Sequence, residues 1–157
     1  MSGRDETEDE RHDRQLNELL QELRVALPGV QVLFAFLLTM PFSARFSEIT
    51  DFQRDVFFGT LLMTVAATIL LMAPSAIHRL LFRRGVKGVI VEMGHRLTIA
   101  GLAALALAMA GAVLLVTDVL FDLTSAVILA ALVLIVFALV WALLPLYGLA
   151  RRPPPRG

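Results

Sequence analysis

Four long stretches without a charged side chain constrain this fold more than any other feature of the sequence. No Asp, Glu, Lys or Arg occurs in residues 25–44, 56–77, 97–117 or 123–150. A helix needs about 20 predominantly apolar residues to cross the ~30 Å hydrocarbon core of a bilayer. Hydrophobic residues make up 57% of the chain, whereas soluble domains contain roughly 45–50%. The sequence therefore predicts an all-α fold, a four-helix transmembrane bundle.

The stretches and their flanks divide the chain into four parts. Residues 1–13 carry charges of both signs and few apolar side chains, and we expect a disordered cytoplasmic tail. Residues 14–27 are expected to form an amphipathic interfacial helix, and residues 151–157 a basic, proline-rich cytoplasmic tail. The transmembrane domain between them, residues 28–150, is expected to contain spans at about residues 28–42, 56–77, 97–117 and 123–149.

Leucines recur at helical spacing before the first span, at positions 16, 19, 20, 23 and 27. We expect this helix to lie in the headgroup layer with its leucines toward the acyl chains, while Arg24 reaches the inner phosphates. The alternative is that the leucines dock on a second helix, from the same chain or from a partner. Pro28 then begins span one, or kinks one long helix.

The other helix ends follow from capping and turn signals. The sequence TDFQ at residues 50–53 has the spacing of a capping box, so helix two is expected to begin near Asp51. Pro74 disfavours a helical conformation in the residue before it, so helix two is expected to end near Ala73. Helix three is expected to begin near Val89, and the short connection at residues 118–124 predicts a tight hairpin of helices three and four.

The basic residues predict the orientation. With a cytoplasmic N-terminus, all of the 14 Lys and Arg residues except Arg45 and Arg54 lie on the inner side. Enrichment of Lys and Arg in short cytoplasmic loops is the usual bias. We therefore predict a multi-pass protein of the cell membrane with both termini in the cytoplasm. Attraction to anionic lipid is worth about 1 kcal/mol per basic residue, so headgroup contacts are expected at Arg79, Arg83, Arg84, Arg151 and Arg152.

Two sets of small side chains recur every four residues within the predicted spans. Small residues at this spacing let helix backbones approach closely in a membrane. Threonine hydroxyls can bond to carbonyls one turn back and need no partner across the interface. We therefore predict packing seams at Thr60, Thr64 and Thr68 in helix two, and at Ala100, Ala104, Ala108 and Ala112 in helix three.

A polar patch is predicted at the inner end of span one. Arg24 and Gln31 are seven residues apart and share a helix face if Pro28 kinks the helix without breaking it. Glu22 belongs to the same predicted patch but is too far around the helix to share all the contacts of Arg24, and Glu92 and Arg96 are expected at a similar depth on helix three. The hypothesis is that Arg24 pairs with Glu92. The alternative is that Arg24 binds only lipid phosphate.

Catalytic and metal-binding patterns are missing from the sequence. The chain has no cysteine, which excludes disulfides and thiol chemistry. Glu92 and His95 have the Glu-x-x-His spacing of a metal pair, but the apolar spans offer no further ligand at that depth. We therefore expect no enzyme, no cofactor and no nucleic-acid partner.

Transport is disfavoured by the positions of the carboxylates. Pumps and antiporters place ionisable groups near the middle of the membrane, whereas every carboxylate here lies at or beyond a predicted interface. A binding or accessory subunit that interacts with lipid or another membrane protein is therefore the leading hypothesis. The alternative is an oligomeric ion or small-solute transporter or channel, in which a homo-oligomer places a pore on its shared axis.

Several stretches resemble an uncharacterised family of small actinobacterial four-span membrane proteins. They are NELLQELRVALPGVQVLFAFLLTMPF, then FQR, APSAIHRLLFR and AMAGAVLLVTDVLF. The similarity covers about residues 16–144, and ELLQELRVALPGVQ is its most specific part. The family is catalogued as a domain of unknown function, so the resemblance implies no reaction. It makes Glu22, Arg24, Pro28 and Gln31 the first residues to examine.

Overall fold

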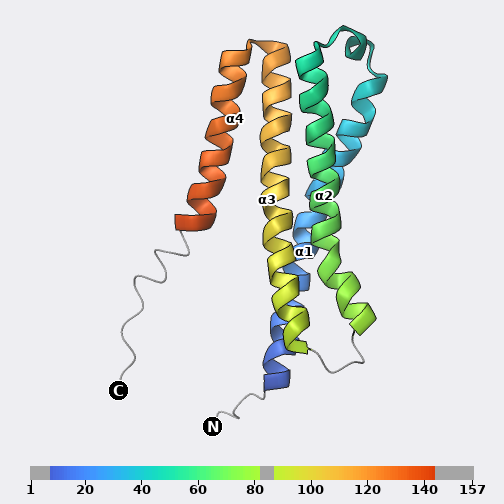
Figure 1. Ribbon diagram of the computed structural model, residues 1–157, viewed down its shortest axis with the longest axis vertical. Helices are drawn as coiled ribbons and strands as arrows, with labels where there is room; N and C mark the ends of the chain where they lie inside the picture. Colours follow the sequence, from blue (N-terminus) through green and yellow to red (C-terminus); the bar gives the residue numbers. More distant parts are fainter. Residues whose placement is uncertain (1–7, 82–86, 144–157) are drawn as a thin grey trace.

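The computed structural model of the protein describes residues 8–81 and 87–143. Its four α-helices run in sequence order as α1 (Glu8–Thr39), α2 (Asp51–Leu81), α3 (Lys87–Leu120) and α4 (Leu123–Ala138) (Figure 1). Two short 3-10 turns, Met40–Phe42 and Ala44–Glu48, connect α1 to α2, and a π-helical turn, Leu139–Leu143, follows α4.

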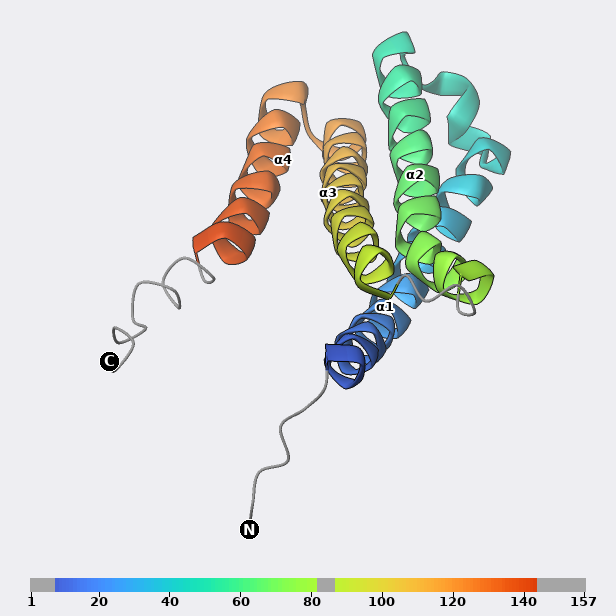
Figure 2. The same ribbon diagram turned by 60° about the horizontal axis from the view of Figure 1, so that its bottom comes forward.

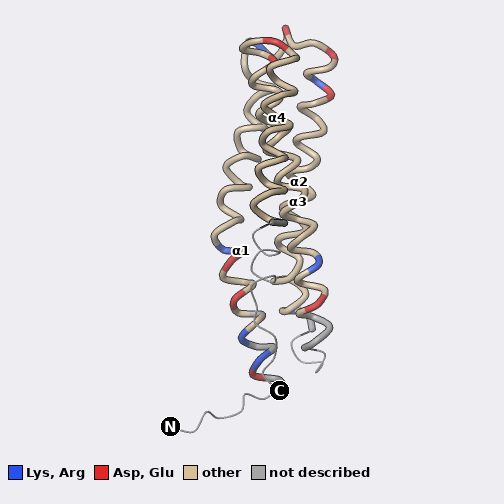
Figure 3. Tube along the Cα trace, turned by 90° about the vertical axis from the view of Figure 1, so that its left-hand side faces the viewer, with Lys and Arg blue, Asp and Glu red and all other residues tan. Residues whose placement is uncertain are grey.

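All four helices are long and apolar enough to cross a membrane. The candidate spans are Asn17–Phe42, Asp51–Leu80, Val91–Leu120 and Leu123–Trp141. The Lys, Arg, Asp and Glu residues gather toward the two ends of the helices and leave the middle uncharged (Figure 3). The prediction of an all-α protein with four helices of membrane-spanning length and composition is confirmed.

The helices pack as a central pair with one helix on each side. Helices α2 and α3 run antiparallel, and α1 crosses behind them from the start of α3 to the start of α2 (Figures 1 and 2). Among the described helices, α4 packs against α3 alone. Helices α1, α2 and α3 therefore share a core, and α4 is peripheral, so the arrangement is more open than a closed four-helix bundle.

Helix α1 enters the core through one residue every seven positions. Leu23, Val30 and Leu37 are at most 3% exposed. A seven-residue repeat keeps one face toward its neighbours while the helix winds across them. Two core clusters result, one of Leu23 and Val30 with Ala67, Leu71 and Ala104, and one of Leu37 with Phe57 and Leu115.

The expected interfacial helix is corrected by this packing. Residues 14–27 belong to the same continuous helix as span one, and Pro28 lies inside it. Leu23 is in the core, and Leu19 and Leu27 pack against it. Leu19, Leu23 and Leu27 therefore dock on helices of the same chain, because α2 and α3 offer an apolar surface that covers them. The helix also begins at Glu8, within the tail expected to be disordered.

The helix ends are partly as predicted. The capping box is confirmed, since the Gln53 amide nitrogen donates to Thr50 Oγ1 (3.2 Å) and the Thr50 amide nitrogen donates to Gln53 Oε1 (3.1 Å). The short hairpin between α3 and α4 is also confirmed. The expected end near Ala73 is wrong, because α2 continues through Pro74 to Leu81.

Pro74 is accommodated because its ring is fully buried against α3. A Cβ built at Gly94 would lie 3.5 Å from Pro74 Cβ, so the glycine leaves room for the ring. The last turns of α2 lean away from α3, as expected where a proline interrupts the helical hydrogen bonds (Figure 1).

At the other end of the chain, residues 144–149 of predicted span four lie outside the described residues.

Candidate functional site

Helices α2 and α3 meet along a seam of small side chains. A Cβ added to Gly111 would overlap Thr60 Oγ1, and a Cβ added to Gly101 would lie 2.8 Å from Leu71. This antiparallel register places Thr64 opposite Ala108, and both residues are 0% exposed. The predicted threonine and alanine stripes therefore face one another, and the small residues allow close approach of the two backbones.

The threonine hydroxyls of the seam are satisfied within α2. Thr60, Thr64 and Thr68 each donate to the carbonyl oxygen four residues earlier, at 2.7, 2.8 and 2.8 Å. These bonds are local, so the hydroxyls need no partner from α3. The seam therefore offers packing and no polar site.

Part of the alanine stripe requires correction. Ala104 and Ala108 are buried and Ala112 is half-buried, but Ala100 is exposed. A four-residue repeat advances about 40° per step around an α-helix, so four such positions cannot all face one neighbour. Gly101 occupies the seam instead. Ala106, off the predicted stripe, is also buried, since α3 is covered by α2 and by α4.

The predicted polar patch is divided between two grooves at the end of the structure where α1 begins. Glu22 lines a groove between α1 and α3, whereas Arg24 lines a groove between α1 and α2. These two residues point about 160° apart around the helix, which explains the division. Gln31 is exposed and is not among the residues that line either groove. The residues predicted as one patch are therefore not brought together.

The hypothesis that Arg24 pairs with Glu92 is wrong for the described structure. Glu92 Oε1 accepts from Arg96 Nε at 2.7 Å, within α3. Arg24 faces α2 on the other side of α1. The nearer i,i+4 partner on the same helix takes the carboxylate, because it needs no adjustment between helices.

The groove between α1 and α3, here the acidic groove, has a volume of about 400 Å³. Its lining consists of Gln15, Glu18, Leu19, Glu22, Val91, Glu92 and His95. Arg14 Nη1 lies 3.5 Å from Glu18 Oε1, and Arg96 pairs with Glu92. Arginines therefore balance two of the three carboxylates of this groove. Within residues 8–81 and 87–143, no three His, Asp or Glu side chains are placed to hold a metal ion.

The groove between α1 and α2, here the basic groove, has a volume of about 420 Å³. Its lining consists of Leu20, Leu23, Arg24, Leu27, Leu71, Ser75, His78 and Arg79. The leucines form an apolar floor, and the lining contains no Asp or Glu. Among the described residues, Arg24 and Arg79 form neither an ion pair nor a hydrogen bond. This groove therefore presents two uncompensated guanidinium groups beside apolar surface.

Ser75 and His78 were missed as candidate site residues by the sequence analysis. They follow Pro74, where helix two was expected to end. Once α2 continues, Leu71, Ser75 and His78 fall at i, i+4 and i+7 on one helix face. The helical pattern of SAIHRLL was the available signal. Of the predicted headgroup arginines, Arg79 lines the basic groove, and Arg83, Arg84, Arg151 and Arg152 lie outside the described residues.

The end of the structure where α2 and α4 begin is polar, and several of its polar side chains are hydrogen-bonded. Gln53 Nε2 donates to Asp118 Oδ2 at 2.9 Å and thereby joins α2 to α3. Asp122 caps α4 by accepting from the Ser125 amide nitrogen (2.9 Å) and hydroxyl (2.8 Å). These two Ser125 donors lower the pKa of the Asp122 carboxyl below its usual value.

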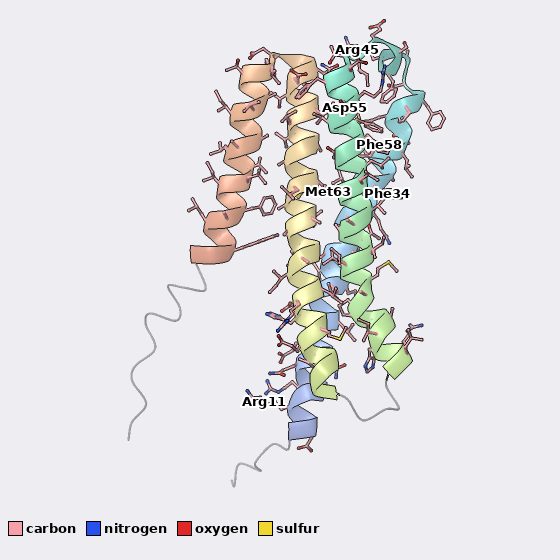
Figure 4. The ribbon with its side chains drawn as sticks, in the orientation of Figure 1. Arg11, Phe34, Arg45, Asp55, Phe58 and Met63 are labelled. Carbon is pink, nitrogen blue, oxygen red and sulfur yellow. The ribbon has the colours of Figure 1, made fainter. Side chains whose placement is uncertain are left out.

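The middle of the described structure contrasts with both ends. In Figure 4 Arg45 and Asp55 lie toward one end and Arg11 at the other, with Phe34, Phe58 and Met63 between them. Among the described residues, the buried polar side chains are four threonines, Thr60, Thr64, Thr98 and Thr117. Ionisable chemistry is therefore confined to the ends of the helices in the described part of the chain.

Comparison with known proteins places the chain in a family. A family of unknown function (DUF6328) matches residues 5–145, which include all four helices. The chain belongs to this family. It matches none of the curated proteins and none of the solved structures with which it was compared. Since the family's function is unknown, membership transfers no reaction and no site residue.

Proposed function

We propose that this protein is a membrane-embedded binding or accessory subunit that interacts with lipid or with another membrane protein. The distribution of polar side chains supports this proposal. Among the described residues the buried polar side chains are threonines, and charged side chains line two grooves at the proposed inner end. Ion-coupled transport uses ionisable groups inside the membrane. Neither an enzyme, a cofactor nor a nucleic-acid partner is part of the proposal.

The proposed location is the cell membrane, with both termini in the cytoplasm. Arg96 and Asp118 bound the charge-free part of α3 and are 22 residues apart, which is about 33 Å at 1.5 Å per residue. This length matches the ~30 Å hydrocarbon core. The bias of Lys and Arg toward one side supports the orientation. The actinobacterial origin suggested by the sequence resemblance belongs to the same proposal.

Cysteine labelling tests the orientation, because the chain has no cysteine of its own. Ser47→Cys and Leu123→Cys should react with an impermeant thiol reagent added to intact cells. Gly88→Cys should react only after the cells are permeabilised. Strong labelling of the Gly88 variant in intact cells would overturn the orientation.

Purification in nanodiscs and reconstitution in liposomes test the function. We expect a lipid or a larger membrane protein to co-purify in stoichiometric amount from the native host. Liposomes containing the protein should conduct protons, Na⁺ and K⁺ no faster than protein-free liposomes. A homo-oligomer with ion flux well above the protein-free control would refute the binding role and support the transporter alternative.

A further inference from the structure

We propose that the basic groove binds the phosphate of an anionic phospholipid from the inner leaflet, with an acyl chain along the groove leucines. This proposal rests on the proposed membrane placement and orientation, and it names the ligand of a site that the binding role leaves open. Three observations carry it: the charge of the groove, its depth and its apolar floor.

The charge of the groove selects an anion. Arg24 and Arg79 extend from different helices to one groove, and neither forms an ion pair or hydrogen bond among the described residues. An uncompensated guanidinium at the edge of a bilayer is costly unless it meets water or an anion. The planar guanidinium matches phosphate oxygens with two parallel hydrogen bonds. Since the lining contains no Asp or Glu, these two guanidinium groups make the groove complementary to a phosphate.

The depth of the groove matches the inner phosphates. Arg24 lies 18 residues before Phe42, the end of the first candidate span, or about 27 Å along a helix. Arg79 lies 24 residues after Asp55, the last charged residue at the outer end of α2, or about 36 Å. With a hydrocarbon core of ~30 Å, both guanidinium groups fall near its inner boundary. Lipid phosphates occupy this level.

The floor of the groove favours a lipid over a free anion. Leu23 is 3% exposed and Leu71 is 0% exposed, and Leu20 and Leu27 complete an apolar wall from α1. A soluble phosphate would contact only the two arginines, whereas a phospholipid would contact the arginines with its phosphate and the leucines with an acyl chain. Each acyl CH₂ buried on such a surface adds to the affinity. Ser75, which also lines the groove, supplies a hydroxyl donor near the rim.

The other groove at the same end provides an internal comparison. Its lining carries Glu18, Glu22 and Glu92, and among the described residues only two of these carboxylates are paired with arginines, so the groove keeps a negative charge that disfavours an anionic headgroup. The proposed lipid therefore occupies one side of α1. Arg96 lines neither groove and pairs with Glu92 near the same depth, which makes it the matched control for removal of one positive charge.

The test measures lipid retained by the purified full-length protein. The protein is placed in nanodiscs of mixed phosphatidylglycerol and phosphatidylcholine, then released for native mass spectrometry. The wild type should retain phosphatidylglycerol in clear preference to phosphatidylcholine. Arg24→Gln and Arg79→Gln should each weaken retention about fivefold, and the double variant about 25-fold. Arg96→Gln should change it less than twofold.

The possible outcomes separate the candidate ligands. Equal retention of the two lipids by the wild type would overturn the proposal even if every variant misfolded. Loss in Arg96→Gln as large as in Arg24→Gln would reduce the effect to general surface charge and would also overturn it. Displacement of the lipid by millimolar inorganic phosphate would identify a free-phosphate site instead. Ion flux in liposomes is measured separately, so failure of lipid selectivity without flux leaves the binding role intact.

Discussion

Replacing Gly111 with Ala tests the α2–α3 seam. The new Cβ would overlap Thr60 Oγ1, which can rotate, but it would also lie 3.3 Å from Thr60 Cβ, which is fixed to the backbone. The two helices must therefore separate by a few tenths of an ångström. Overpacking of this kind costs roughly 1–3 kcal/mol, and Gly→Ala inside a helix offsets about 0.8–1 kcal/mol of that. We expect a net destabilisation of up to about 2 kcal/mol.

Gly59→Ala is the matched control. Gly59 lies in α2 next to Thr60, and a Cβ added there meets no atom within 4 Å. This variant should therefore be stabilised by about 0.5–1 kcal/mol through helix propensity alone. The measurement is reversible unfolding in mixed micelles with increasing dodecyl sulfate. The difference between the two variants isolates the seam contact, at roughly 1–3 kcal/mol.

A double-mutant cycle then identifies Thr60 as the contact. Thr60→Ala removes the hydroxyl and methyl groups near the new Cβ at Gly111 but keeps the Thr60 Cβ at 3.3 Å, so it relieves part of the overlap. The combination of both substitutions should be more stable than the sum of the single effects. If Gly111→Ala is stabilised as much as Gly59→Ala, the helices are not in close contact there and the seam argument fails.

Three further predictions concern single polar groups. Thr98 Oγ1 is buried without a hydrogen-bond partner in the described structure, so Thr98→Val should keep or raise stability, by up to about 1–3 kcal/mol; clear destabilisation in the unfolding assay would mean that the hydroxyl has a partner. Since the pKa of Asp122 is lowered, its carboxylate stabilises α4 at pH values above the unfolded-state pKa of about 3.9. This stabilisation is lost as the pH falls through the pKa of the folded protein. Asp122→Ala should flatten that part of the stability–pH profile, and an unchanged profile would contradict the cap. Arg24→Glu and Glu92→Arg should be additive in stability because they line different grooves; recovery in the double variant would restore the rejected pair.

The number of long apolar helices and several helix ends were predictable because they depend on local properties. A charge-free run and the bilayer thickness define a span without knowledge of its neighbours. Likewise, the Thr50–Gln53 capping box and the Asp122 cap involve residues three apart, so their hydrogen bonds follow from the sequence itself. These features need no tertiary packing.

Choices that depend on tertiary contacts were not predictable from one sequence. The leucine face of residues 14–27 suits a lipid surface or a protein surface equally, and only the presence of α2 and α3 beneath Leu23 decides. Pro74 would end most helices, but room at Gly94 lets α2 continue. As a result, Ser75 and His78 join the basic groove, which no short-range pattern pairs with Arg24.

The close seam also explains why the two grooves lie at one end. Between Thr60 and Leu71, small residues hold α2 against α3, and α1 packs its leucines over both. Beyond this section the last turns of α2 lean away from α3 (Figure 1), so one helix cannot cover both neighbours. A space therefore remains on each side of α1. Because Glu22 and Arg24 point about 160° apart, they give the two spaces opposite charge, and a ligand of either sign meets a separate surface.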